Sequence, residues 1–128
     1  MLEYSALLFI IPAVYAWYKN NLDYGNAFLF LTITSYIYHN SNKYMETTWR
    51  FWIDQFAILN IVLIGIYNYI YYCTNYYCQI FIFICFIGCI ILHLLNKFFV
   101  DENNINKILH ISIHVITFIA HSLIISRY

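Results

Sequence analysis

The chain consists of apolar segments of near-bilayer length that are separated by short polar connectors. A helix needs about 20 mostly apolar residues, with about 17–25 as the usual range, to cross the hydrocarbon core of a membrane. Five segments approach or meet that length: residues 2–18, 22–39, 49–72, 77–95 and 105–125. We therefore predict an all-α fold, an integral membrane bundle of about five transmembrane helices that forms a single domain over residues 1–128.

Three local features refine this pattern. Pro12 lies inside the first segment, where a proline removes a backbone hydrogen bond, so it predicts a kink. Asn20 and Asn21 are a turn signal between the first two segments. The stretch 67–77 is rich in tyrosine, as expected of an aromatic belt at the membrane interface. It covers the predicted turn between the third and fourth helices.

The composition supports the membrane assignment and narrows the choice of partners. The chain is 63% hydrophobic and 9% charged, whereas soluble domains are roughly 45–50% apolar. Lysine and arginine together number 6, the formal net charge is zero, and no basic run occurs. Nucleic-acid binding therefore has no electrostatic support. The partner that the composition implies is the lipid bilayer.

Three polar clusters inside the apolar segments stand out: Ser35 with His39, then Asp54, then His110 with His114. An ionisable side chain at membrane depth costs roughly 2.5–3.5 kcal/mol on insertion scales, so its default interpretation is a functional site. With five crossings, the end of the second helix and the starts of the third and fifth lie at the same face of the membrane. We therefore expect these five residues to form one site.

The spacing and chemistry of these residues suit a zinc ion. His110 and His114 are four residues apart, so they share one helix face and can present two imidazoles to one metal. With His39 they make three histidine ligands and leave a fourth position open, the pattern of a catalytic zinc. Asp54 could accept the proton of the activated water as general base. Ser35 could hold the hydroxide or the developing oxyanion.

The remaining histidines have a simpler interpretation. A single histidine in a membrane helix commonly makes an interhelical hydrogen bond, worth about 0.6–2 kcal/mol. We favour that role for His93 and for His121. By the helical rise, His121 lies about 10 Å deeper than His114, so it is expected outside the ligand set.

Of the four cysteines, Cys78, Cys85 and Cys89 follow one helix face, where cysteine usually behaves as a small apolar residue. Cys73 and Cys78 flank the tyrosine-rich turn. They could form a disulfide if that turn faces an oxidising compartment.

Basic residues give a prediction of orientation. The side of the membrane that carries the site has four of them and the opposite side has two, and the positive-inside rule places the richer side in the cytoplasm. The four on the site side are Lys43, Arg50, Lys97 and Lys107, and the two opposite are Lys19 and Arg127.

The order of these motifs resembles the CREST superfamily, which contains the alkaline ceramidases, the adiponectin and progestin receptors, and proteins of GPI-anchor lipid remodelling. The pattern reads S-Y-I-Y-H from Ser35 to His39, then Asp54 in W-R-F-W-I-D-Q-F, then H-I-S-I-H from His110 to His114. The resemblance implies a zinc held by the three histidines, with its water in contact with Asp54 and Ser35. It also implies hydrolysis of an amide or ester bond in a membrane lipid of the ceramide or phospholipid class.

The chain departs from the superfamily in two ways. Members have a seven-helix core, whereas this sequence offers five segments. The alkaline ceramidases bind calcium through an N-terminal acidic cluster, and this chain has only Glu3 there, which argues against a strict ceramidase. The shortened bundle also makes a homo-oligomer plausible.

Two alternatives from other classes stay open. The first is a non-catalytic multi-pass membrane protein, receptor-like or an assembly partner, whose metal site would be intact without lipid turnover. The second is a haem-binding electron-transfer protein. Two ligands one turn apart cannot clamp opposite haem faces, so His39 would pair with His110 or His114. A Soret absorption band would distinguish haem from zinc.

Overall fold

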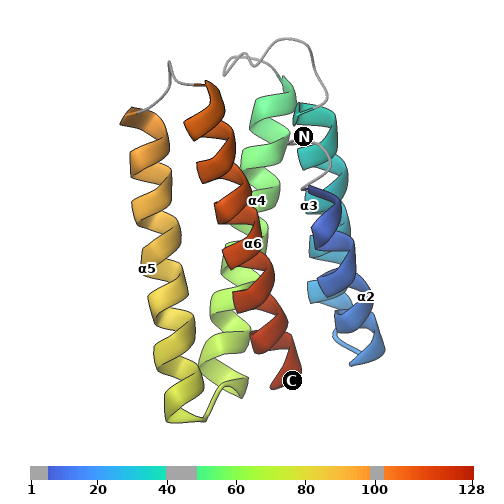
Figure 1. The fold of residues 1–128 in the computed structure, drawn as a ribbon. Helices are drawn as coiled ribbons and strands as arrows, with labels where there is room; N and C mark the ends of the chain where they lie inside the picture. The colour runs from blue at the N-terminus through green and yellow to red at the C-terminus, as the bar shows by residue number, and fades with distance from the viewer. Residues whose placement is uncertain (1–5, 40–48, 99–102) are drawn as a thin grey trace.

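The computed structural model describes residues 6–39, 49–98 and 103–128. Within these ranges the chain is all-α, as predicted, and folds as a bundle of five helices (Figure 1). A short 3-10 turn precedes the first of them. The elements are η1 (Leu7–Phe9), α2 (Ile10–Tyr18), α3 (Leu22–His39), α4 (Trp49–Tyr72), α5 (Tyr76–Phe98) and α6 (Asn103–Ser126). Within these helices, the structure describes the backbone but not the side chains of six residues: His39, Lys97, Phe98, Asn103, Asn104 and Asn106.

The predicted boundaries agree closely with these elements. The segments 22–39 and 49–72 coincide with α3 and α4, and α5 and α6 are each slightly longer than predicted. The first segment is helical from Leu7, and residues 1–5 lie outside the described part of the chain. A kink at Pro12 stays a prediction: α2 runs from Ile10 through Pro12, and the local feature beside the proline is the 3-10 turn η1 that precedes α2. Proline has no N–H to donate to the Leu8 carbonyl, so the turn before it tightens.

The turn between α2 and α3 is fixed by two asparagines. Asn20 has a positive φ of 63°, a conformation that asparagine tolerates better than most residues. The Asn21 amide donates to the Ala16 carbonyl at 2.8 Å and the Asn20 amide to Trp17 at 3.0 Å, which is a Schellman motif. The Asn21 side chain then caps α3, since its Oδ1 accepts from the Tyr24 amide at 3.4 Å. The predicted turn is confirmed.

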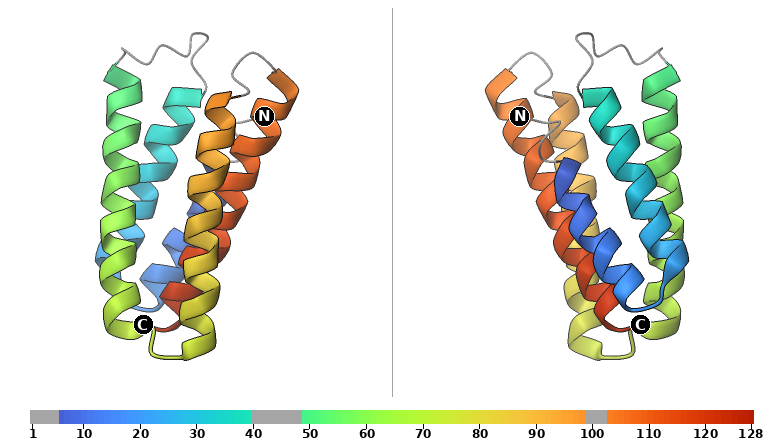
Figure 2. Two further views of the ribbon diagram at one scale, coloured as in Figure 1. Left: turned by 90° about the vertical axis from the view of Figure 1, so that its left-hand side faces the viewer. Right: turned by 90° about the vertical axis from the view of Figure 1, so that its right-hand side faces the viewer.

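Packing divides the helices into an interior and an edge. Helix α3 packs between α2 and α4, and α6 contacts α2 and α4 as well as α5. Helix α5 lies at the edge of the bundle beside α6 (Figure 2). Its outer surface is a broad apolar face that includes Phe83, Ile84 and Ile91, all exposed. Such a surface is suited to contact with lipid rather than with water.

Within the described part of the chain, three helices are long and apolar enough to cross a membrane. They are Trp49–Tyr72, Tyr76–Asn96 and Lys107–Ser126, and the helix Leu7–Tyr18 is apolar but shorter. These lengths support the assignment of the chain as a membrane protein.

Candidate metal and catalytic site

The two ends of the bundle differ in what they hold. At one end α3 finishes and α4 and α6 begin (Figures 1 and 2), and we call it the site end because Ser35, Asp54, His110 and His114 all lie in the adjoining halves of these helices. The opposite end carries the turn between α2 and α3 and the turn between α4 and α5, and we call it the turn end.

Asp54 is the most unusual side chain of the site end. It is only 3% exposed, on the face of α4 that packs against α3. Among the described residues, its hydrogen-bond donor is Thr34, whose hydroxyl lies 3.5 Å from Asp54 Oδ1. That hydroxyl also lies 3.2 Å from the Leu31 carbonyl, so its single proton is shared. Ser35, the next residue on α3, is equally buried. The Asp54 carboxyl and the Thr34 hydroxyl thus meet between two helices, with the buried Ser35 next in the chain.

His110 and His114 form a contact pair on α6. Their ring centroids lie 4.6 Å apart with the planes at 75°. His114 is buried and meets the edge of the Phe9 ring, with centroids 5.1 Å apart, while His110 is partly exposed. His93 on α5 is close enough to His110 for an electrostatic interaction. Two neighbouring imidazoles therefore face one side of α6, with a third nearby.

The donor set fits a zinc ion in part. Two imidazoles one turn apart are a common pair of zinc ligands. The predicted third ligand, His39, ends α3 at the same end of the bundle, but its side chain lies outside the described residues. Among the side chains that are described, no group of three His, Cys, Asp or Glu is arranged to hold a metal. The three-histidine site stays a prediction that depends on His39.

Thr34 is the residue that the sequence analysis missed. The neighbouring Thr32 hydroxyl does not reach Asp54, because it donates to the Phe28 carbonyl of its own helix at 2.7 Å. Thr34 is the hydroxyl that reaches Asp54. The signal that could have found it was the concentration of small hydroxyl residues from Thr32 to Ser35 in an otherwise apolar helix.

At the turn end, polar groups are paired between helices. The His121 ring, through Nδ1, is hydrogen-bonded to the Tyr24 hydroxyl, which confirms the expected interhelical role of His121. Asn21 Nδ2 donates to Asn68 Oδ1 at 2.9 Å, and Asn68 Nδ2 donates to the Ile64 carbonyl at 2.8 Å. These bonds join α6 to α3, and the start of α3 to α4.

An aromatic layer separates the two regions. Phe9 contacts both His114 and Phe28, with ring centroids 5.1 Å and 5.9 Å apart, and Phe28 contacts His121 at 5.1 Å. The Tyr24 ring stacks on Phe28. Two buried phenylalanines therefore lie between the histidine pair of the site end and the histidine of the turn end.

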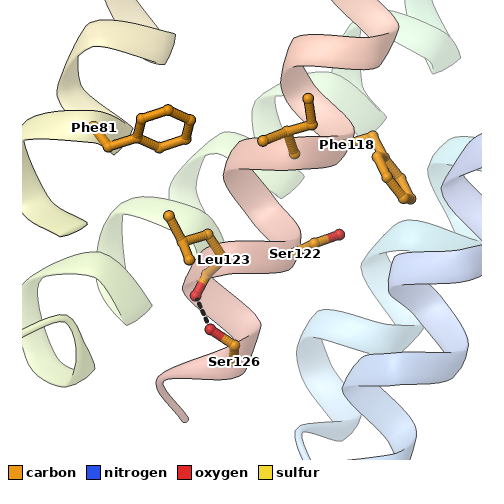
Figure 3. Close-up of a pocket in the computed structure, with 6 residues that line it drawn as sticks. Phe81, Phe118, Ser122, Leu123 and Ser126 are labelled. Atoms are coloured by element: carbon orange, nitrogen blue, oxygen red, sulfur yellow. Dashed lines mark hydrogen bonds between the residues drawn. The ribbon is translucent and has the colours of Figure 1, made fainter.

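A shallow apolar hollow of about 400 Å³ opens between α5 and α6. In Figure 3, Phe81 extends from α5 toward α6, and the Ser126 hydroxyl is hydrogen-bonded to the Leu123 carbonyl. The other lining residues are Phe118, Ile119 and Ser122. The hollow lies beside the C-terminal half of α6, away from Asp54.

Comparison with models of known protein families, with curated proteins and with solved structures finds no match to this chain. The resemblance to the CREST superfamily therefore rests on the motif residues themselves.

Proposed function

We propose that this protein is a multi-pass membrane enzyme that hydrolyses an amide or ester bond of a membrane lipid with the help of a zinc ion. In this proposal it is a shortened member of the CREST superfamily. The observation that carries the proposal is the burial of Asp54 beside Thr34, at the end of the bundle that also holds the His110–His114 pair.

The cost of burying these groups supports a functional role. A carboxylate enclosed between apolar helices is unfavourable unless it is compensated by partners, and a single shared hydroxyl proton compensates it weakly. An apolar residue at position 54 would pack between α3 and α4 without that cost. The presence of Asp54 at this buried position therefore favours a task that needs a proton acceptor in a region of low water content.

The residues have distinct roles in the proposed reaction. His39, His110 and His114 would hold the zinc ion, which when bound polarises the substrate carbonyl and lowers the pKa of water to about 7. Asp54 accepts a proton from the attacking water and returns it to the departing amine or alcohol. The Ser35 hydroxyl donates a hydrogen bond to the carbonyl oxygen as that oxygen gains negative charge.

The depth of Asp54 favours a lipid as the substrate. It lies five residues after Trp49, the first residue of α4, which is about 7–8 Å along the helix axis. With Trp49 at the membrane interface, where tryptophan is enriched, Asp54 would lie near the level of the amide or ester carbonyls of lipids. Acyl chains would then extend into the bilayer alongside the bundle, so the substrate enters sideways from the membrane.

Turnover of defined lipids tests the proposal. Purified protein in vesicles is given a fluorescent ceramide and a fluorescent phospholipid, and release of fatty acid is followed before and after removal of metal by a chelator. We expect hydrolysis of one lipid class, loss of it on chelation, and recovery with added zinc. Retained zinc without hydrolysis of either lipid would favour the non-catalytic alternative, and a Soret band would favour the haem protein.

A further inference from the structure

Two thiols meet at the turn between α4 and α5. Cys73 follows the last residue of α4, and Cys78 lies in the first turn of α5. Their Sγ atoms are 3.2 Å apart, and both side chains are buried, at 1% and 6% exposed. A disulfide has its sulfurs about 2.0 Å apart. The two thiols therefore need only a small approach to form one.

The turn holds the two cysteines in this position through its own hydrogen bonds. Asn75 caps α5, since its Oδ1 accepts from the amides of Tyr77 at 3.0 Å and Cys78 at 3.2 Å. Gln79 Nε2 donates to the Cys73 carbonyl at 2.7 Å. The Tyr69 hydroxyl of α4 donates to the Gln79 carbonyl at 3.0 Å. Both flanks of the turn are thus tied to each other, so the sulfurs are held together by the backbone around them.

The other two cysteines, Cys85 and Cys89, can be compared with the Cys73–Cys78 pair. Cys85 and Cys89 are four residues apart on α5, and such positions have Cβ atoms about 5–6 Å apart, whereas a disulfide needs about 3.5–4.5 Å. Cys89 Sγ instead lies 3.7 Å from the Thr117 hydroxyl of α6. This pair is therefore unsuited to a disulfide within the chain.

We propose that Cys73 and Cys78 form a structural disulfide that closes the turn between α4 and α5. The two thiols are oxidised by an external disulfide, either that of a small thiol compound or that of a thiol oxidoreductase. This external disulfide accepts the two electrons and two protons and is thereby reduced to two thiols. The new bond therefore requires that the turn end faces an oxidising compartment. This inference is independent of the proposed hydrolase activity.

The environment of Cys73 favours a permanent bond over a redox switch. Burial, with a further contribution from the neighbouring Cys78, raises the pKa of the Cys73 thiol to about 11. A switch needs an accessible thiolate, and this thiol is neither accessible nor ionised at neutral pH. The bond would form while the chain folds and then stay shielded from exchange.

The basic residues are consistent with this orientation. The site end carries four lysine and arginine residues and the turn end two, a difference that by the positive-inside rule favours a cytoplasmic site end. The turn between α4 and α5 then faces the opposite compartment, where disulfides persist. The charge distribution thus favours the orientation that the proposed disulfide requires.

Differential labelling of thiols tests the proposal. Membranes from expressing cells are solubilised in denaturant with excess N-ethylmaleimide, which blocks every free thiol at once. The full-length chain is then reduced and treated with a polyethylene-glycol maleimide, so that each label adds a visible shift on a gel. Since the chain has four cysteines, we expect two labels. Absence of label would overturn the proposal.

Two variants identify the pair. Cys85→Ser/Cys89→Ser should still take two labels, because it retains the turn cysteines. Cys73→Ser should take none, because Cys78 is then free and is blocked. Two labels on Cys73→Ser would show that other cysteines are bonded and would also overturn the assignment. Because the readout is taken in denaturant, it does not depend on the stability of either variant.

Discussion

The two ends of the bundle bury similar polar groups but satisfy them differently. At the turn end, Asn21 bonds to Asn68 and His121 to Tyr24. At the site end, Asp54 shares one hydroxyl proton with a backbone carbonyl. Asn96 Oδ1, near the end of α5, is buried without a hydrogen-bond partner in the described part of the chain. Buried polar side chains thus have hydrogen-bond partners at the turn end, whereas Asp54 and Asn96 at the site end are incompletely hydrogen-bonded within the described part of the chain.

This difference distinguishes polar groups that stabilise the fold from polar groups that are available for chemistry. A fully paired polar group rigidifies the bundle and specifies which helix faces meet. An incompletely paired buried group lowers stability, so its presence needs another explanation. At the turn end, the hydrogen bonds between helices account for the buried polar side chains. At the site end, the hydrogen-bonding capacity that Asp54 and Asn96 leave unused among the described residues is available to a substrate, a water or a metal ion.

The largest effect is expected from Asp54→Asn. Loss of the proton acceptor should lower lipid turnover by about 10²–10⁴-fold, the usual contribution of a general base, while the metal content stays unchanged. The rate of fatty-acid release from vesicles measures this.

Asn68→Ala is the matched control at the other end of α4. It removes a buried polar side chain that bonds to Asn21, so it should lower thermal stability but leave turnover per folded molecule intact. If both variants lost turnover equally, the functional distinction between the two ends would fail.

The next effect is a loss of stability from Gly65→Ala. A Cβ at this position would lie 2.6 Å from His121 Cε1 and 3.2 Å from the Tyr24 hydroxyl. His121 cannot move away easily, because it is held by Tyr24 and by the Phe28 ring. We expect destabilisation of about 1–3 kcal/mol, as for other overpacked cores, measured by thermal unfolding in detergent.

Gly88→Ala is the control for that substitution. A Cβ there has open space around it, and alanine favours a helix over glycine by about 0.5–1 kcal/mol. It should therefore leave stability unchanged or raise it slightly. Equal losses from the two alanines would mean that the packing around His121 is loose.

A smaller loss is expected from Tyr24→Phe. The variant keeps the ring that stacks on Phe28 but leaves His121 Nδ1 without its partner. Interhelical hydrogen bonds in membranes are worth about 0.6–2 kcal/mol, and unfolding measurements should show a loss in that range. Zinc content should not change. A change in zinc content would connect the turn end to the site.

The smallest effect is expected from Thr34→Val, which has nearly the same shape. It removes the hydroxyl that reaches Asp54, so the orientation of the carboxylate becomes less fixed. We expect turnover to fall by about two- to tenfold, which corresponds to a hydrogen bond of about 0.5–1.5 kcal/mol. An effect as large as that of Asp54→Asn would instead assign the chemistry to Thr34.

The helices could be predicted from the sequence because their length and polarity follow directly from the requirements of a bilayer. The turn at Asn20 could also be predicted, since it depends on local backbone chemistry. What could not be predicted was which polar groups meet. The contacts of Asn21 with Asn68 and of Tyr24 with His121 join residues 47 and 97 positions apart, and they depend on how the helices cross.

The site was predictable as a set of residue types and less so as a geometry. The i, i+4 spacing correctly placed His110 against His114, because that contact lies within one helix. The link of Thr34 to Asp54 depends on the rotation of α3 against α4, and no periodicity in the sequence encodes it. For Cys73 and Cys78 the sequence left a disulfide open as one alternative, and the structure places their Sγ atoms 3.2 Å apart.

Metal analysis of detergent-purified protein tests the central claim most directly. Wild type is compared with His110→Ala/His114→Ala at the site end and with His121→Gln at the turn end, and circular dichroism confirms that each variant is helical. The account predicts about one zinc per chain in wild type and in His121→Gln, and none in the double variant. Absence of zinc from wild type, or equal zinc in all three proteins, would contradict it.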